Sequence, residues 1–393
     1  MMKRSVVIIG GGVMGAATAC FLARDQDANV TVVERDPSYA RASSSLSASS
    51  IRVQFSQPVN IRLSLWSLDF LRRVDEELAV DGDSPAIGLV EPGYLYLASA
   101  AGADTLRGNA HIQAAEGAQV SLLGPAALQA RFPWLHCDDL ELGSLGLSDG
   151  ASGEGWFDGP ALHQAFRRKA IACGARFLAA EVSGFETRGA HVTAALTSQG
   201  QRLQADTFVL AAGAWSAAPA AQLGVALPVV ARKRDVFVFH SPAALPGCPL
   251  VIDPSGLWFR PEGRHFLCGA PPRDGDPEEP PLHAIDHGLF DEQLWPALAH
   301  RVPGFEALRL HSAWAGYYEM NDFDHNGLAG ALPGWDNVHL ACGFSGHGMQ
   351  QAPAVGSALA ALVSGGTSSA PALDALSASR LLEGRPLLET NVI

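Results

Sequence analysis

The feature that most constrains the fold is a glycine-rich turn close to the start of the chain. Residues 5–9 are mainly β-branched, which is typical of a strand that is buried on both faces. The residues after them follow the order GxGxxG, and its glycines are Gly10, Gly12 and Gly15. The first glycine allows a tight turn, the second lets a pyrophosphate approach the backbone, and the third lets helix and strand pack closely. The pattern predicts a Rossmann-like α/β unit.

A second strand supports the same prediction. Residues 29–33 are mainly β-branched, and Glu34 and Arg35 follow them. The N-terminus of the intervening helix, at Val13 and Met14, offers N–H groups and a partial positive charge to phosphates. Glu34 is placed to accept hydrogen bonds from an adenosine ribose. The fingerprint therefore predicts a dinucleotide cofactor, and it does not separate FAD from NAD.

Composition narrows the class of protein. The chain has 393 residues, of which 48% are hydrophobic and 17% are charged, so we expect a compact globular protein with two domains. Its formal net charge of −13 disfavours nucleic acid and anionic membrane as partners, because phosphate binding depends on clustered lysine and arginine. Six cysteines occur without a CxxC pair, which predicts reduced thiols in a cytoplasmic protein.

The N-terminal segment has an alternative interpretation. Lys3 and Arg4 precede an apolar run, as they do in a secretory signal peptide. Glycines interrupt that run, and the pattern of a folded unit continues beyond it, so we expect no cleavage. No apolar run reaches the length of a membrane span.

A second glycine cluster lies near the C-terminus, in residues 342–351 (CGFSGHGMQQ). It does not form a hydrolase nucleophile elbow, which needs Gly-x-Ser-x-Gly, because His347 stands two residues after Ser345. One cysteine and one histidine lack the second pair of ligands that a zinc site needs, so no metal is predicted. From these residues alone, an anion-binding loop and a plain loop both stay open.

The middle of the chain predicts further strands of the same unit. Asp158, Gly159 and Pro160 indicate the start of a helix, and Gly174 indicates its end. The runs that then alternate like an antiparallel meander are residues 175–181, 185–187, 191–197 and 202–204. Residues 207–215 follow as a buried return strand, which flavoproteins with an extended FAD need and NAD dehydrogenases do not.

A separate antiparallel sheet is predicted from other runs of high β-propensity. These runs are residues 93–97, 235–239, 257–260 and 265–268. Residues 271–281 are rich in proline, glycine and acids, and we expect them to form a solvated loop.

Four motifs stand in a characteristic order along the chain. They are VVIIGGGVMG with VVERD, then GWFDGPAL, then VLAAGAWS, and finally WAGYYEMNDFDHNGLAG leading into CGFSGHGMQQAPAVG. This order resembles the FAD-dependent amino acid oxidoreductases, which include glycine oxidase, sarcosine oxidase, D-amino acid oxidase and D-arginine dehydrogenase. The resemblance spans nearly the whole chain and implies a two-domain α/β fold, with a Rossmann-like FAD-binding domain and an inserted antiparallel-sheet substrate domain. It assigns residues 1–86, 146–222 and 315–393 to the FAD domain, and residues 87–145 and 223–314 to the substrate domain.

The resemblance also implies where FAD lies. The late glycine loop wraps the flavin ring, and the helix after it points its N-terminus at the edge where negative charge builds on reduction. Residues 41–52 (RASSSLSASSIR) pass the flavin and reach the substrate, and a solvated serine-rich loop is the alternative. The expected FAD contacts beyond the first turn and second strand are Ser43, Ser44, Ser45, Val182, Ala212, Gly213, Trp215, Gly343, Ser345, Gly346, His347, Gly348, Met349 and Gln350.

A covalent link to FAD is not expected. Sarcosine oxidase-like relatives tether the flavin through a cysteine, and the matching residues 314–318 (WAGYY) contain no thiol. Cys342, inside the late loop, is the one other thiol to consider.

For the substrate, the resemblance assigns carboxylate binding to Arg52, since a guanidinium pairs with a carboxylate through two hydrogen bonds. His347 either orients or deprotonates the amine, or only braces its loop. Trp258 either lines the substrate or belongs to the core. Tyr318 replaces an arginine of glycine oxidase, and Gln350 replaces a lysine of sarcosine oxidase-like enzymes. The anchor is incomplete by either template, so we expect a larger substrate or a carboxylate that is held differently.

These features predict an FAD-dependent enzyme that oxidises the C–N bond of an amino acid or N-substituted amino acid by hydride transfer to flavin N5. Residues 264–269 lack the lysine that speeds the reaction with oxygen in sarcosine oxidase-like enzymes. We therefore expect a dehydrogenase with a quinone or another acceptor. Lys233, or a cationic His265, keeps open an oxygen-using oxidase that produces peroxide. A flavin-bound, non-catalytic assembly factor is the alternative from another class.

Overall fold

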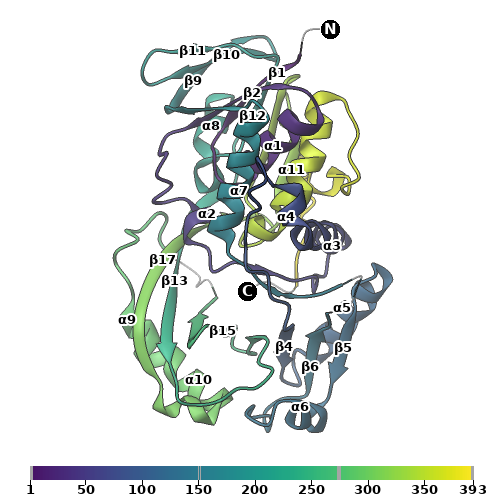
Figure 1. Ribbon diagram of the computed structural model, residues 1–393, viewed down its shortest axis with the longest axis vertical. Helices are drawn as coiled ribbons and strands as arrows, with labels where there is room; N and C mark the ends of the chain where they lie inside the picture. The colour runs from purple at the N-terminus through teal and green to yellow at the C-terminus, as the bar shows by residue number, and fades with distance from the viewer. Residues whose placement is uncertain (1–2, 149, 151, 272–275, 391–393) are drawn as a thin grey trace.

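The computed structural model describes residues 3–148, 150, 152–271 and 276–390, and most of its strands belong to two large sheets (Figure 1). The sheet that contains the N-terminal strand lies in the upper half of the view. The larger sheet lies in the lower half, and the two halves meet at the middle of the molecule.

The upper sheet is built around the strand that precedes the first glycine turn. Its order is β18 (Leu328–Ala331), β19 (Val338–Cys342), β12 (Thr207–Leu210), β1 (Ser5–Ile9), β2 (Asn29–Glu34) and β8 (Arg176–Ala179). All neighbouring pairs are parallel except β18 with β19. The predicted first, second and return strands are therefore confirmed, and β1 lies between the other two.

Both faces of the upper sheet are covered, which explains why β1 is apolar at every position after Ser5. Val6 and Ile8 pack under helices, while Val7 and Ile9 pack under a small antiparallel sheet. The helices are α1 (Val13–Asp25), α7 (Gly159–Ala172) and α11 (Gly348–Ser364). The small sheet consists of β9 (Val182–Arg188), β10 (His191–Thr197) and β11 (Arg202–Leu203).

The predicted meander is wrong in its first strand. β8 does not join the small antiparallel sheet but pairs in parallel with β2 at the edge of the upper sheet. Phe177 packs against the helical side and Leu178 against the opposite side, so β8 extends both layers of the core. A short alternating run shows that a strand is present but not which neighbour it pairs with. The other three predicted strands form the meander.

The lower sheet has one long edge strand and seven shorter neighbours. Its order is β17 (Arg309–Asn321), β13 (Val229–His240), β16 (His265–Gly269), β15 (Trp258–Glu262), β14 (Leu250–Ile252), β4 (Tyr94–Ala98), β6 (Leu142–Gly146) and β5 (Val120–Leu123). The four predicted runs are confirmed as β4, β13, β15 and β16. The prediction of a purely antiparallel sheet is wrong at one pair, because β14 and β4 are parallel. β14 has three residues, too few for periodicity to reveal it.

The remaining α-helices and one pair of short strands lie outside these sheets. The remaining helices are α2 (Ser43–Leu46), α3 (Pro58–Arg72), α4 (Val74–Glu77), α5 (Ala103–Ala115), α6 (Pro125–Arg131), α8 (Ala217–Gln222), α9 (His287–Leu289), α10 (Trp295–Arg301) and α12 (Ser379–Leu382). Strands β3 (Ser50–Ile51) and β7 (Gly155–Trp156) pair with each other. Within the described ranges, no helix is both long and apolar enough to cross a membrane.

The strands of the upper sheet come from three stretches of the chain, as the resemblance implies. β17 runs without a break across the predicted boundary between residues 314 and 315, and the domain boundaries stay a prediction. In the predicted loop 271–281, residues 272–275 lie outside the described residues. Of its described part, Glu279 donates its backbone N–H to the carbonyl oxygen of Ala231 at 2.9 Å, which lays the loop against β13.

A testable consequence concerns the contact between α1 and α11. A Cβ at Gly356 would lie 2.7 Å from the Cβ of Ala17. Gly356→Ala is therefore expected to push α11 off α1 and to lower the free energy of unfolding by about 1–3 kcal/mol. Gly108, on the exposed side of α5, has open space at its Cβ position. Gly108→Ala is the control and should raise the free energy of unfolding by about 0.5–1 kcal/mol. Urea unfolding measures both changes, and shifts of the same sign would contradict the close contact.

Candidate active site

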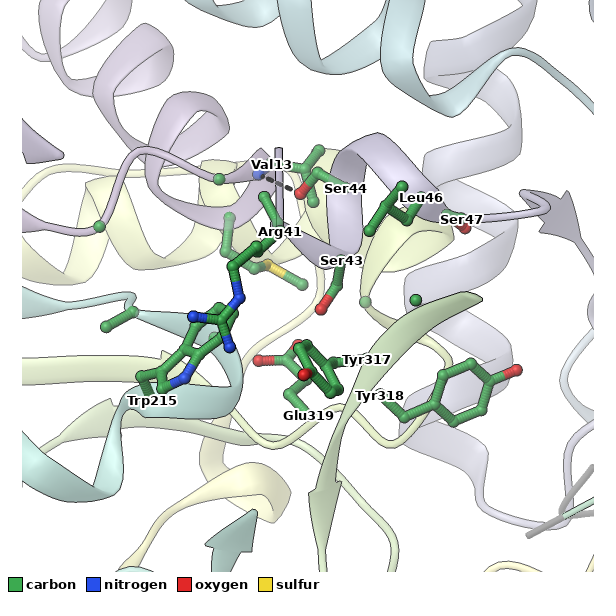
Figure 2. Close-up of a pocket in the computed structure, with 18 of the residues that line it drawn as sticks. Val13, Arg41, Ser43, Ser44, Leu46, Ser47, Trp215, Tyr317, Tyr318 and Glu319 are labelled. Atoms are coloured by element: carbon green, nitrogen blue, oxygen red, sulfur yellow. Dashed lines mark hydrogen bonds between the residues drawn. The ribbon is translucent and has the colours of Figure 1, made fainter. Parts of the chain in front are cut away.

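One cavity of about 1240 Å³ lies between the two large sheets, and both glycine loops line it. A single-ligand pocket usually measures about 300–1,000 Å³. The cavity therefore has room for a dinucleotide and a small substrate together. Figure 2 shows part of its wall, where α2 and β17 lie on opposite sides of the space.

The turn after β1 is closed tightly against its surroundings. A Cβ at Gly15 would lie 2.0 Å from the carbonyl oxygen of Gly10. A Cβ at Gly10, whose φ is +103°, would lie 2.3 Å from the carbonyl oxygen of Ala211. Gly10 and Gly12 line the cavity, whereas Gly15 lies behind them and lets α1 pack on β1. The close contacts at Gly10 and Gly15 agree with the tight turn and the helix packing that the fingerprint predicts for the first and third glycines.

The serine-rich segment is part of the cavity wall. The Oγ of Ser44 accepts a hydrogen bond from the backbone N–H of Val13 at 2.9 Å, which ties α2 to the start of α1 (Figure 2). Ser43 and Ser44 line the cavity, and Ser45 does not. Because Ser44 is only 7% exposed, the alternative of a solvated loop is wrong at this residue.

Glu34 ends β2 with its carboxylate beside the first turn. Its Oε2 accepts from the N–H of Gly11 and its Oε1 from the N–H of Asp36, each at 2.8 Å. The carboxylate lines the cavity, and it retains lone pairs that can accept from hydroxyl groups of a ligand. This arrangement suits the ribose contact that the fingerprint predicts.

The outer part of the wall is an aromatic and charged cluster around Trp215. The guanidinium carbon of Arg41 lies 5.5 Å from the centre of the Trp215 ring (Figure 2). The guanidinium carbon of Arg35 lies 4.4 Å from the same centre. Glu279 accepts from Trp215 Nε1 at 2.9 Å and from Arg41 Nη2 at 2.6 Å. Arg35 and Trp215 were predicted to lie at this site. Arg41 and Glu279 were missed, because they meet only through the tertiary structure.

The late glycine loop passes through the left-handed backbone region at Gly343, Ser345 and Gly346, with φ of +71°, +49° and +95°. A Cβ at Gly346 would lie 2.7 Å from the ring of Tyr318, so only glycine fits there without displacement. Residues 345–350 line the cavity. Gly343 lies behind them.

Several other residues that were predicted to contact FAD belong to the cavity wall. Val13, Met14, Val182, Ala212 and Gly213 all line the cavity. The chain therefore brings the first turn, the return strand and the late loop to one space.

Arg52 lies in the wall beyond the late loop and is 3% exposed. Its Nη1 donates to the carbonyl oxygen of Gln54 at 3.3 Å and to the hydroxyl of Tyr96. Its Nη2 is 3.1 Å from Nε2 of His347. The guanidinium carbon lies 4.2 Å from the centre of the Phe55 ring. The protein therefore fixes this guanidinium on several sides.

The contact with Arg52 sets the protonation of His347. A guanidinium has no acceptor atom, so Nε2 of His347 accepts the hydrogen bond and the ring proton is on Nδ1. Burial, and then the charge of Arg52, hold the pKa of His347 well below its ordinary value. The imidazole is therefore neutral, with its acceptor nitrogen already engaged. This geometry favours the alternative in which His347 braces the loop over proton abstraction from the amine.

The other two predicted substrate residues also have clear contacts. The Oε1 of Gln350 accepts from the backbone N–H of Arg52 at 2.7 Å. This bond joins the start of α11 to the segment between β3 and α3. Trp258 lines the cavity and also packs against the cluster around Tyr94 and Tyr96. Trp258 can therefore belong to the core and face the cavity at the same time.

Glu319 is a wall residue that sequence reasoning missed. It extends from β17 on the same side as Tyr317, whereas Tyr318 points to the other side (Figure 2). Its Oε2 accepts from the N–H of Gly343 at 3.2 Å. Burial raises the pKa of Glu319 to about 7, against the lowering effect of backbone hydrogen bonds from Gly343 and Phe344. A charged residue inside the largely apolar run WAGYYEMN was the available signal.

Five further basic and aromatic wall residues were not predicted, and two of them are Tyr39 and Tyr317. The other three bear on the substrate end. They are Tyr94, Arg234 and Arg260. The six cysteines and three lysines all lie in the described part of the chain, and none lines the cavity. Cys342 is buried, and burial raises the pKa of its thiol.

The two groups considered for oxygen activation are held elsewhere. Lys233 donates to the carbonyl oxygen of Ala284 and lies 3.1 Å from Oδ1 of Asp235. His265 stacks on His311, with 4.6 Å between the ring centres. Neither Lys233 nor His265 lines the cavity.

One group of side chains in the described chain has the spacing of metal ligands. It consists of His136, Asp139 and His300, none of which lines the cavity. Arg301 pairs with both carboxylate oxygens of Asp139, at 2.9 Å each, so that carboxylate already has a cation. The cluster adds nothing to the chemistry of the cavity.

Comparison with known proteins identifies the family. The family model described as FAD dependent oxidoreductase matches residues 5–362. The chain belongs to this family. It is thus an FAD-dependent oxidoreductase, and the predicted resemblance and two-domain fold are confirmed. The wall fits FAD, because bare glycine backbone, the start of α1 and the Glu34 carboxylate follow one another along it.

Individual relatives extend this comparison. The chain is 41% identical over 431 residues to FAD-dependent oxidoreductase domain-containing protein 1 of Xenopus laevis, covering 100% of this chain and 85% of that protein. It is 28% identical to the glycine oxidase of Geobacillus kaustophilus, covering 92% of this chain and 93% of that enzyme. It resembles the structure of L-proline dehydrogenase from P. horikoshii with a TM-score of 0.84 and 25% identity, covering 98% of this chain and 99% of that chain.

The carboxyl group of Glu319 is expected to make stability depend on pH. Its pKa is about 7 in the folded chain, against an ordinary value of 4.5. Between these values the folded chain holds a proton that the unfolded chain has released. The free energy of unfolding therefore falls as pH rises, by up to about 1.4 kcal/mol per pH unit.

Glu319→Gln cannot bind or release this proton, so the free energy of unfolding is expected to fall less steeply with pH. The measurement is urea unfolding of the cofactor-free protein at several pH values between the two pKa values. Glu306→Gln, at an exposed position, is the control and should keep the slope of the natural chain. An unchanged slope in Glu319→Gln would show that this carboxyl titrates normally.

Proposed function

We propose that this chain oxidises the C–N bond of an amino acid or N-substituted amino acid. The observation that carries the proposal is the junction in one cavity between the cofactor loops and a wall containing Arg52, Tyr318 and Trp258. The names of related proteins support it, since they include a glycine oxidase, a sarcosine dehydrogenase and an L-proline dehydrogenase. When bound, FAD accepts the hydride that leaves the substrate carbon at flavin N5.

The residues of the wall have separate tasks in this proposal. Arg52 and Tyr318 bind the substrate carboxylate, and Trp258 closes the side of the pocket. His347 holds the Arg52 guanidinium in place through its Nε2, and Gln350 holds the Arg52 backbone. Such fixed placement aims the carbon–hydrogen bond at the cofactor, which is the protein's main contribution to hydride transfer.

The cofactor is proposed to be bound without a covalent link. No cysteine lines the cavity, and the thiol of Cys342 is kept protonated by its burial. The contacts that retain FAD are then the first turn, Glu34 and the late loop. The predicted FAD contacts and domain boundaries are part of this proposal.

Arg52 is tested by a conservative change. Arg52→Lys keeps the charge but loses the planar fork, so it is expected to lower kcat/KM by about 10- to 100-fold. The FAD content should not change. Arg62→Lys, on the surface beside Glu116, is the matched control and should behave like the natural chain. If kcat/KM is the same in both variants, Arg52 does not bind the substrate.

The acceptor is proposed to be a quinone or a similar carrier and not oxygen. The feature that supports this proposal concerns the lysine that speeds the reaction with oxygen in sarcosine oxidase-like enzymes. In this chain neither Lys233 nor His265 lines the cavity, and the cations that do line it are guanidinium groups. Protein reduced anaerobically by its amine substrate is expected to reoxidise slowly in air-saturated buffer and rapidly with an added quinone, followed by stopped-flow absorbance of the flavin.

Two other outcomes are informative. Rapid reoxidation with stoichiometric peroxide would identify an oxidase. A flavin that no amine bleaches, in a screen of sarcosine, proline, D-amino acids and opines, would contradict amine oxidation and favour a non-catalytic role.

A further inference from the structure

The substrate end of the cavity is strongly cationic. Arg52, Arg234 and Arg260 all line it, and they are 3%, 8% and 4% exposed. This concentration of positive charge occurs in a chain whose formal net charge is −13. Buried charges of one sign lose hydration and repel one another, so they need anionic partners. What differs among the three guanidinium groups is how far the protein itself provides those partners.

Arg260 is partnered through both of its terminal nitrogens, and only its buried Nε has no hydrogen-bond partner among the described residues. Its Nη1 contacts the carboxylate of Glu262 and donates to the carbonyl oxygen of Pro261 at 3.1 Å. Its Nη2 donates to the carbonyl oxygen of Ala48 at 2.8 Å. These contacts tie β15 to the segment after α2. Arg260 is therefore mainly structural.

Arg234 is partnered on one side only. Its Nη1 donates to the carbonyl oxygen of Lys233 at 2.6 Å and lies 3.3 Å from Oδ2 of Asp276. Its Nε and Nη2 are buried, and neither has a hydrogen-bond partner among the described residues. The pKa of Arg234 is lower than its usual value because of burial, and the nearby Tyr318 and Asp276 offset only part of this effect. The guanidinium is thus a buried cation with two unused donors.

The two unused donors form a binding edge. Nε–H and Nη2–H lie on the same side of a planar guanidinium, and together they match the two oxygens of a carboxylate. The ring of Tyr318 packs over the group, with 5.2 Å between the ring centre and the guanidinium carbon. Because both donors are buried and the ring covers the group, an acid can reach this edge only if the ring of Tyr318 turns aside. Burial raises the pKa of the Tyr318 hydroxyl, and the charges of Arg234 and Arg52 both act against this rise.

We infer that the substrate carries a second acidic group and that Arg234 binds it. The class is then a dicarboxylic amino acid or an N-carboxyalkyl amino acid, with its α-carboxylate at Arg52. This inference rests on the proposed function, because it names the substrate of the same cavity. It also accounts for the incomplete carboxylate anchor at Tyr318 and Gln350, since positive charge is supplied from β13 instead.

The first test compares matched acids and neutral analogues on the natural protein with its FAD. The pairs are glutamate with glutamine, and iminodiacetate with sarcosine. Each is added anaerobically, and flavin bleaching gives kcat/KM. The diacid is expected to be preferred by about 10- to 100-fold, the range for a charge-assisted hydrogen bond. Equal values within both pairs would overturn the inference and leave amine oxidation standing.

The second test uses variants and a direct binding measurement. Arg234→Gln is expected to lower kcat/KM for the diacid by about 10- to 100-fold more than for the monoacid, so that the preference for the diacid is lost. Arg232→Gln is the matched control, since Arg232 lies on the same strand, pairs with Asp322 at 2.8 Å and does not line the cavity. A preference for the diacid that survives in Arg234→Gln would contradict the assignment.

Binding of acids that cannot reduce the flavin separates the two proposals. Glutarate and butyrate are titrated against the visible spectrum of the oxidised flavin. Glutarate is expected to bind about 10- to 100-fold more tightly than butyrate, with the difference lost in Arg234→Gln. If no amine bleaches the flavin, the proposed reaction fails while this measurement still decides the role of Arg234. Equal affinities in the natural protein would overturn that role even if Arg234→Gln does not fold.

Discussion

The close contact of α1 with its neighbours is the constraint on which the rest of the molecule depends. At Gly15 the helix lies against the backbone of Gly10, and at Ala17 it lies against Gly356 of α11. Both contacts exclude a side chain, so they fix α1 between the first strand and the last long helix. The loop before α11 is therefore brought beside the turn after β1. Gly15 and Gly356 have no Cβ, and this lets α1 pack closely on β1 and on α11. The cavity wall can therefore combine segments from both ends of the chain.

Burial governs the ionisable groups of that cavity. A buried group either has a charged or hydrogen-bonding partner or shifts towards its neutral form. His347 is neutral and accepts from Arg52, and Glu319 holds a proton up to about pH 7. Guanidinium groups keep their charge at any ordinary pH, so Arg52 is surrounded by acceptors and an aromatic ring. Among the described residues, two donors of Arg234 have no hydrogen-bond partner, whereas Arg260 leaves only its Nε without one.

The residues proposed to bind the substrate carboxylate lie at one end of the cavity. The resemblance predicts that Tyr318 and Gln350 replace cations of related enzymes. Here the ring of Tyr318 covers Arg234, and the amide of Gln350 holds the backbone of Arg52. The positive charge at this end of the cavity includes Arg234 on β13 and Arg52 before α3. The family and the cofactor are shared with the relatives, whereas the acid-binding geometry is proposed to be particular to this chain.

Local pattern determined a large part of this protein. The order of β-branched run, GxGxxG and terminal acid predicted β1, α1, β2 and the place of Glu34 at the end of β2, because turn sterics and strand periodicity act within a few residues. Pairing between distant segments was decided only by the tertiary structure. β8 joined the upper sheet and not the meander, and the register of β13 with β17 placed Arg234 opposite Gly316 and diagonal to Tyr318. That register depends on which side chains fill the space between the sheets, and no short stretch of sequence records it.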